Sequence, residues 1–107
     1  MATELGQGVG RLMARVIVSQ AALRDLTRLE AWLAERSPEA AGRIGPLLDA
    51  ALASLADHPE RGRQGPRAAL RELVVPFGGA AYLVQYRIEA SAGMVVVARV
   101  RHSRERR

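Results

Sequence analysis

Three apolar stretches in the second half of the chain decide its fold: LRELVV (residues 70–75), YLVQYRI (residues 82–88) and VVVARVRH (residues 95–102). The stretches are rich in valine, leucine and tyrosine, and the segments between them, PFGG and EASAG, contain glycines that suit turns. This pattern predicts three consecutive antiparallel strands. Since so small a sheet needs other elements to cover one face, only its other face is left for function.

The segment before these strands predicts a pair of helices. Ser19 is a good N-cap, and apolar residues, Trp32 among them, recur after it at spacings of three and four up to Leu33. The sequence SPE at residues 37–39 then supplies a second cap, a proline at the first helical position and an acidic first turn. Apolar residues continue the pattern to about Asp57. With almost no linker between them, the two helices are expected to form an antiparallel hairpin.

Pro46 interrupts the apolar pattern of the second helix. Proline cannot donate the main-chain hydrogen bond of its turn, which costs about 3 kcal/mol inside a helix. We expect a kink at Pro46 with the helix continuing through it. The alternative is a helix that starts only at Pro46.

The order of elements predicts an α+β domain of the type β-α-α-β-β-β, with an N-terminal helical hairpin packed on a small antiparallel sheet. Its first strand is expected in MARVIV (residues 13–18), and 107 residues suit one domain, here residues 13–107. Residues 1–12 alternate glycine with polar residues and show no period. We interpret them as a disordered extension, or as residues that precede the native start.

Several classes of function are excluded or disfavoured by composition. The chain has no cysteine, so disulfides, thiol chemistry and cysteine-ligated zinc are excluded. His58 and His102 are too few to bind a metal without carboxylate help, and we predict neither a metal site nor a cofactor. No apolar run approaches the roughly 20 residues of a membrane span, and no segment resembles a signal peptide. A cytoplasmic location without membrane contact is therefore expected.

The positive charge of the chain is concentrated in its second half. The formal net charge is +5, all sixteen basic residues are arginine, and ten of these lie from Arg61 onward. A GC-rich genome accounts for arginine in place of lysine, but the positions still indicate an anionic partner. The candidate residues for binding a target or partner are Arg61, Arg63, Arg71, Arg87, Arg99, Arg101, His102 and Arg104.

Side-chain alternation assigns these residues to faces of the predicted sheet. The even-numbered residues of 94–102 are apolar as far as the histidine, so they are expected to face the helices. The odd-numbered residues then place Arg99 and Arg101 on the open face, with Arg71 or Arg87 beside them. The open face is thus predicted to carry a cluster of arginines.

The joint order of a strand, two helices and the motifs HPERGR (residues 58–63), LRELVV, YLVQYRI and VVVARVRHSRE (residues 95–105) resembles the RelE/ParE superfamily of bacterial toxins. The resemblance covers residues 14 to about 105. It implies the β-α-α-β-β-β fold and the toxin of a type II toxin–antitoxin module, which stabilises plasmids by addiction. It also implies a hetero-oligomer with a cognate antitoxin, encoded adjacently, whose acidic or amphipathic segment folds on the toxin.

Two branches of the superfamily differ in their targets. RelE-type members cleave mRNA on the ribosome, and their middle strand typically carries an arginine that contacts the scissile phosphate. This chain has Leu83 at that place, and no tyrosine follows its last strand. A leucine cannot stabilise the developing negative charge. The resemblance therefore favours the ParE-type branch, which is associated with inhibition of DNA gyrase by binding rather than by catalysis, so we do not expect an enzyme.

Two alternatives remain open. A ribosome-dependent mRNA interferase would have to use Arg71, Arg99 and His102, with the histidine moving protons. We favour a structural His102 that closes the apolar side of the last strand and hydrogen-bonds to the backbone. The second alternative is an inactive toxin that only binds its antitoxin.

Overall fold

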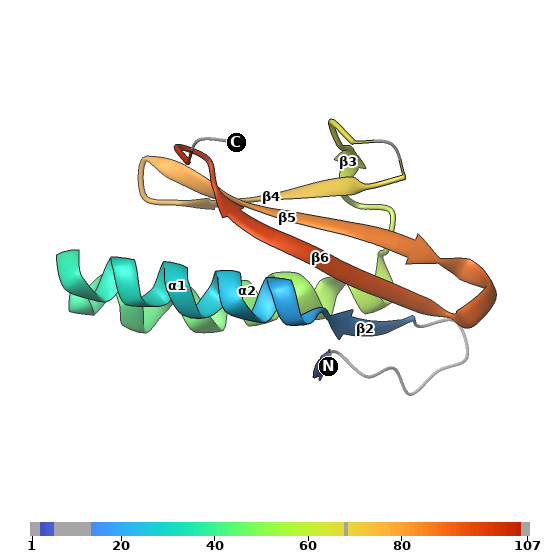
Figure 1. Cartoon of the computed structure of the whole chain (residues 1–107), viewed down its shortest axis with the longest axis horizontal. Coiled ribbons are helices and arrows are strands. Elements are labelled where there is room, and N and C mark those ends of the chain that lie inside the picture. The colour runs from blue at the N-terminus through green and yellow to red at the C-terminus, as the bar shows by residue number, and fades with distance from the viewer. Residues whose placement is uncertain (1–2, 6–13, 68, 106–107) are drawn as a thin grey trace.

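Two helices lie side by side against one face of a single six-stranded sheet (Figure 1). The computed structural model describes residues 3–5, 14–67 and 69–105. The elements in chain order are β1 (Thr3–Leu5), β2 (Arg15–Val18), α1 (Gln20–Arg36), α2 (Pro38–Asp57), β3 (Arg63–Gln64), β4 (Arg71–Phe77), β5 (Ala80–Glu89), the short 3₁₀ helix η1 (Ala90–Ala92) and β6 (Met94–His102). The α+β class and the helical hairpin are confirmed.

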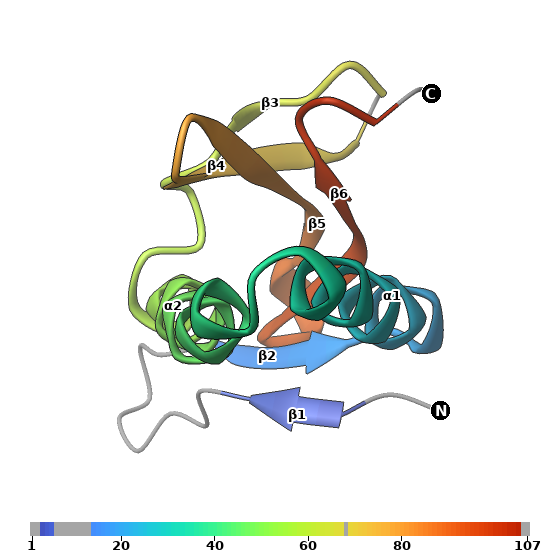
Figure 2. The same cartoon turned by 90° about the vertical axis from the view of Figure 1, so that its left-hand side faces the viewer.

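The sheet is mixed rather than antiparallel throughout. Its strand order is β1-β2-β6-β5-β4-β3, and β4, β5 and β6 pair antiparallel as predicted. Strand β2, however, pairs in parallel with β6, with Arg15 opposite Met94 and Val18 opposite Val97. Two parallel neighbouring strands need a long connection between them. The connection from β2 to β6 starts with the helical hairpin, which lies against the face of the sheet (Figure 2).

The N-terminal segment differs in part from its prediction. Thr3–Leu5 forms strand β1, which pairs antiparallel with β2, so the predicted disorder does not hold for these three residues. The other residues of 1–12, and Met13, lie outside the described part of the chain. The domain boundary at residue 13 stays a prediction.

Both predicted helix caps are confirmed. The Ser19 hydroxyl accepts a hydrogen bond from the Ala22 N–H (3.1 Å) at the start of α1. Ser37 is the single residue between the helices; its hydroxyl accepts the Ala40 N–H (3.2 Å) and its own N–H donates to the Leu33 carbonyl (2.7 Å). One serine therefore ends α1 and starts α2, which makes the hairpin tight.

Helix α2 continues through Pro46, so the alternative of a helix that starts at this proline is wrong. Pro46 and Gly42, whose carbonyl loses its helical partner, both lie on the exposed side of the helix. Water can therefore bond the orphaned carbonyl. Neither helix of the described chain is long and apolar enough to cross a membrane.

The core fills the space between the helices and the sheet. Both helices and the four strands β2, β4, β5 and β6 contribute to it: Val16, Val18, Ala22, Leu29, Ile44, Leu48, Ala51, Leu52, Leu55, Ala56, Leu73, Val75, Tyr82, Val84, Tyr86, Val95, Val97 and Val100. The strands send alternate residues into this core, for example Leu73 and Val75 in β4 and Tyr82, Val84 and Tyr86 in β5.

In β6, a β-bulge reverses the faces predicted for its first half. Val97 pairs with Tyr86 and Arg99 with Gln85, so Ala98 is an extra residue without a partner on β5. Val97 and Val95 are therefore buried in the core together with Val100, although the simple alternation placed odd-numbered residues on the open face. The prediction is confirmed for Val100 and wrong before the bulge, because the extra residue shifts the alternation by one.

Ser19 stabilises this bulge from the neighbouring element. Its hydroxyl donates to the Ala98 carbonyl (3.0 Å) and its N–H donates to the Val97 carbonyl (3.0 Å). Strand β2 ends at Val18, so it offers no further donors to β6. Ser19, the residue that caps α1, therefore supplies the hydrogen bonds that these two β6 carbonyls need.

Candidate functional site

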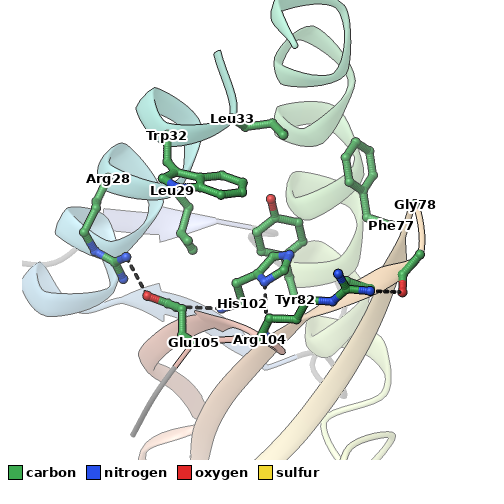
Figure 3. Close-up of a pocket in the computed structure, with 12 residues that line it drawn as sticks. Arg28, Leu29, Trp32, Leu33, Phe77, Gly78, Tyr82, His102, Arg104 and Glu105 are labelled. Carbon is green, nitrogen blue, oxygen red and sulfur yellow. Dashed lines mark hydrogen bonds and ion pairs between the residues drawn. The ribbon is translucent and has the colours of Figure 1, made fainter. Parts of the chain in front are cut away.

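A cavity of about 600 Å³ lies between the second half of α1 and the ends of β4, β5 and β6 (Figure 3). Large side chains surround it, and charged or polar groups form its rim. The lining residues are Arg28, Leu29, Trp32, Leu33, Phe77, Gly78, Gly79, Ala80, Tyr82, His102, Arg104 and Glu105. This volume is in the range of sites that bind small molecules or single side chains of a partner.

Trp32 is a wall of this cavity and not a core residue, which corrects its place in the predicted apolar pattern of α1. The residue is 44% exposed. The Arg36 guanidinium lies over its ring at 4.0 Å from the centroid, and the His102 ring lies at 6.0 Å in a tilted arrangement. An exposed indole between two polar groups is typical of a contact surface.

His102 closes the floor of the cavity. Its Nδ1 accepts a hydrogen bond from the Arg104 N–H (3.2 Å), and its ring stands edge-on to Tyr82 at 5.2 Å between centroids. The backbone hydrogen bond agrees with the structural interpretation of His102. The ring nevertheless lines the cavity, where a bound group would touch it.

Asp25 of α1 is buried beside the bulge, although helical periodicity groups it with the polar residues. It accepts hydrogen bonds from Arg99 Nε (2.8 Å) and Nη2 (3.1 Å) and from the Val100 N–H (2.9 Å). Burial alone would raise the pKa of Asp25, but the bonds from Arg99 and Val100 outweigh it and lower that pKa below its usual value. Asp25 thereby fixes α1 to the unpaired edge of β6.

Arg28 links Asp25 to the C-terminal turn. Its guanidinium lies 3.5 Å from Asp25 Oδ1 and 2.6 Å from Glu105 Oε2, and Glu105 Oε1 accepts the His102 N–H (2.7 Å). Partial burial would raise the pKa of Glu105, but the His102 N–H and Arg28 lower it overall. A continuous set of charge-assisted bonds therefore runs from the bulge to one edge of the cavity.

Stability is expected to fall at acid pH because of these two carboxylates. Their pKa values are lowered by folding, so their contribution is complete above the unfolded values near pH 4 and is lost as pH falls through the folded values. Urea denaturation at intervals from pH 7 to pH 3 measures this decline. Asp25→Asn should flatten it, and a variant whose pH profile runs parallel to the wild type would contradict the assignment.

The predicted arginine cluster is not formed as such. Arg71 donates through Nε to the Gly62 carbonyl (3.0 Å) and through Nη2 to the Glu60 carbonyl (3.0 Å). Tyr86 reinforces the same loop: its hydroxyl donates to the Pro59 carbonyl (2.6 Å) and accepts the Gly62 N–H (2.9 Å). Arg71 is thus a support of the loop that follows α2 and does not lie on the open face.

The other candidate arginines are distributed over several surfaces. Arg63 pairs with the buried Glu72 (3.0 Å), Arg61 donates to the Ser54 hydroxyl (2.7 Å), Arg87 pairs with Glu89 (2.6 Å) and Arg104 donates to the Gly79 carbonyl (3.4 Å). The side chain of Arg101 makes no hydrogen bond or ion pair with any other residue of the described chain.

The three residues that a nuclease would need are held apart. Arg71 lies opposite Tyr86 on β5, whereas His102 lies opposite Tyr82, four residues further along the same strand. Four residues of strand span about 13 Å. Arg99 meanwhile binds the Asp25 carboxylate through Nε and Nη2. These side chains do not converge on one phosphate.

Sequence reasoning missed most of the cavity. Arg28 and Trp32 lie four residues apart and so share one helix face, a signal that could have been used. Phe77 and Glu105 carry no local signal, because only the tertiary fold brings them to that helix. Within the described residues, no group of three histidine, aspartate or glutamate side chains is arranged to hold a metal ion.

Comparison with known proteins identifies the family. The family description of the ParE toxin of type II toxin–antitoxin systems matches residues 16–107. Toxin RelE1 of Caulobacter vibrioides is 50% identical over 93 residues, which cover 86% of this chain and 96% of that protein. Toxin RelE3 of the same organism is 44% identical over 95 residues, covering 89% of this chain and 100% of that protein.

The fold is also similar to a solved structure. The crystal structure of the toxin–antitoxin complex RelBE2 from Mycobacterium tuberculosis contains a chain with a TM-score of 0.59 and 23% identity, covering 90% of this chain and 98% of that one. At this identity the likeness concerns the fold. The sequence matches confirm the resemblance noted above: the chain belongs to the RelE/ParE superfamily, in the ParE toxin family of type II toxin–antitoxin systems.

Proposed function

We propose that this type II toxin acts in the cytoplasm by binding and inhibiting DNA gyrase, and that a cognate antitoxin encoded beside it holds it inactive in a hetero-oligomer. The observation that carries the proposal is the absence of a converged nuclease site among the described residues. Arg71 and Arg99 bind the Gly62 carbonyl and Asp25, and Arg71 lies four strand positions away from His102. A toxin without a reactive constellation acts through binding.

Leu83 supports the same conclusion. It lies on β5 opposite Val74 and Arg101, is only 7% exposed, and takes the place where RelE-type toxins carry their phosphate-binding arginine. A buried leucine neither donates a hydrogen bond nor stabilises an anion. The cations that remain exposed suit recognition of an acidic surface.

An antitoxin partner follows from the family and from the charge of the chain. The solved structure with a similar fold is that of a toxin–antitoxin complex. The formal net charge of +5 favours an acidic partner segment that folds on the toxin.

We expect the purified toxin at micromolar concentration to inhibit supercoiling of relaxed plasmid by gyrase, or to trap cleaved DNA on it. The same protein mixed beforehand with equimolar antitoxin is the control and should leave gyrase active. Inhibition requires binding only, so it should be stoichiometric and not increase with incubation time. Unimpaired supercoiling at a several-fold excess of free toxin would contradict the proposal.

A ribosome-dependent mRNA interferase is the second candidate. It is favoured by the names of the curated relatives, which are RelE toxins, and by the position of His102 in a cavity with Tyr82 and Arg104. Codon-specific cuts in mRNA on translating ribosomes, abolished by His102→Ala, would establish it. His102→Ala is a cleaner test than Arg71→Ala, because Arg71 supports a loop. Harmless expression without antitoxin would instead indicate an inactive toxin that only binds its partner.

A further inference from the structure

The cavity beside Trp32 combines apolar walls with a carboxylate that is already bound at its edge. We propose that the cavity receives an apolar side chain from an acidic segment of the antitoxin, and that Glu105 in the free toxin takes the place of a carboxylate of that segment. This inference rests on the proposed antitoxin partner. The inference adds which toxin residues bind the antitoxin, and it adds Glu105 as a competitor within the toxin for the same site.

The apolar half of the site is formed by three aromatic side chains from different elements. Trp32 of α1, Phe77 of β4 and Tyr82 of β5 surround the hollow (Figure 3). Trp32 is one of only three large hydrophobic residues that are exposed among the described residues, and it lies where the cavity opens. An exposed indole at the edge of an apolar hollow provides an anchor for a buried partner side chain.

The polar half of the site is a pair of donors that converge on one carboxylate. Arg28 Nη1 lies 2.6 Å from Glu105 Oε2, and the His102 N–H lies 2.7 Å from Glu105 Oε1. Each carboxylate oxygen has its own donor, which is how a carboxylate is recognised specifically. A carboxylate from another chain would find the same two donors if Glu105 moved aside.

Displacement of Glu105 requires little change elsewhere. The Arg28 side chain is 49% exposed, and that of Glu105 is 26% exposed and belongs to the short turn after β6. The buried Asp25 lies 3.5 Å from Arg28 Nη2, so it keeps the guanidinium oriented when Glu105 leaves. An exchange between two carboxylates conserves charge at the site.

The chemistry favours an acidic peptide over a nucleic acid or a second copy of this chain. The Arg36 guanidinium lies over the Trp32 ring, so that face of the ring is not free for a nucleic-acid base to stack on. Arg36, Arg43 and Arg104 add positive charge around the apolar hollow. Two copies of a chain with this charge repel each other, whereas an acidic segment is attracted.

The first test asks whether Glu105 competes with the antitoxin. The probe is the purified antitoxin encoded beside this chain, and the equilibrium and dissociation rate constants are measured by surface-based binding. Glu105→Gln weakens the internal contact and is expected to tighten binding about three- to tenfold. Glu89→Gln is the matched control, because Glu89 also pairs with an arginine at 2.6 Å but at the other end of β5. It should change affinity less than about twofold.

The second test addresses the site itself. Trp32→Ala and Arg28→Ala should each weaken antitoxin binding about tenfold or more, whereas Arg24→Ala, an exposed arginine of the same helix, should have little effect. Trp32→Phe should restore part of the affinity. Trp32 is the only tryptophan of the chain, so bound antitoxin should also protect its fluorescence from quenching by acrylamide.

The outcomes separate this inference from the proposed function. Equal affinities of Glu105→Gln and Glu89→Gln would overturn the competition, and wild-type affinity of Trp32→Ala would overturn the site, while both leave the antitoxin partner established. No binding by the wild-type toxin would overturn the proposed partner and this inference with it. Protection of Trp32 by an oligonucleotide, or by self-association in sedimentation, in place of the antitoxin would also overturn the inference.

Discussion

Asp25→Ala is expected to lower the free energy of unfolding by about 3 kcal/mol. The carboxylate is buried and accepts two bonds from Arg99 and one from the Val100 N–H. Without it, the N–H of the fully buried Val100 has no acceptor, and an unsatisfied buried donor costs about 1–3 kcal/mol. Arg99 and Arg28 lose their shared partner as well, although both are exposed enough for water to bond them in part.

Urea denaturation followed by the fluorescence of Trp32 measures this loss. Asp49→Ala is the matched control: it removes the same charge from an exposed position on α2 and should change stability by less than about 0.5 kcal/mol. Asp25→Asn keeps one acceptor and should give an intermediate value. Equal stabilities of the variants at residues 25 and 49 would show that the bonds at the bulge contribute nothing.

Gly62→Ala is expected to destabilise the fold by about 2–3 kcal/mol through overpacking. A Cβ at Gly62 would lie 2.6 Å from the hydroxyl oxygen and 2.8 Å from Cε1 of Tyr86, and 3.1 Å from the backbone carbon of Glu72. The Tyr86 ring is fully buried and cannot move aside. The loop would have to shift, and its bonds to Tyr86 and Arg71 would weaken.

Gly42→Ala provides the comparison for this variant. A Cβ at Gly42 meets nothing within 4 Å, and the position lies inside helix α2. Alanine should therefore raise stability by about 0.5–1 kcal/mol through its better helix propensity. Thermal melts of the two variants should shift in opposite directions from the wild type, and shifts in the same direction would contradict the packing argument.

Local chemistry was sufficient to predict the helical hairpin from the sequence. Ser19 and Ser37 act as caps because a serine hydroxyl bonds the free N–H groups of the turn that follows it, and no distant residue alters this. The three antiparallel strands follow equally from their own composition. The parallel pairing of β2 with β6 and the bulge at Ala98 do not, because both depend on contacts between residues far apart in the sequence.

The candidate site was less predictable for the same reason. Helical periodicity places Asp25 with the solvent-facing charges. The structure instead buries Asp25 against the edge of β6, where its carboxylate accepts the Val100 N–H. Trp32 has the spacing of a core residue, yet it lies beyond the core, over the cavity. For Arg71, Arg99 and His102, the residue type is known from the sequence, but the group to which each side chain hydrogen-bonds is not. Only the fold decides which arginines remain available.

The parallel pairing of β2 with β6 has a consequence for how the toxin is made. Ser19 and Ala98, which join α1 to the bulge of β6, are 79 positions apart, and β2 meets β6 over a similar span. A ribosome therefore delivers the helical hairpin long before the strand that completes the sheet, and contacts of such high sequence separation form slowly. Folding of this domain on the ribosome has to wait for β6, so the folded toxin emerges only once almost the whole domain has been translated.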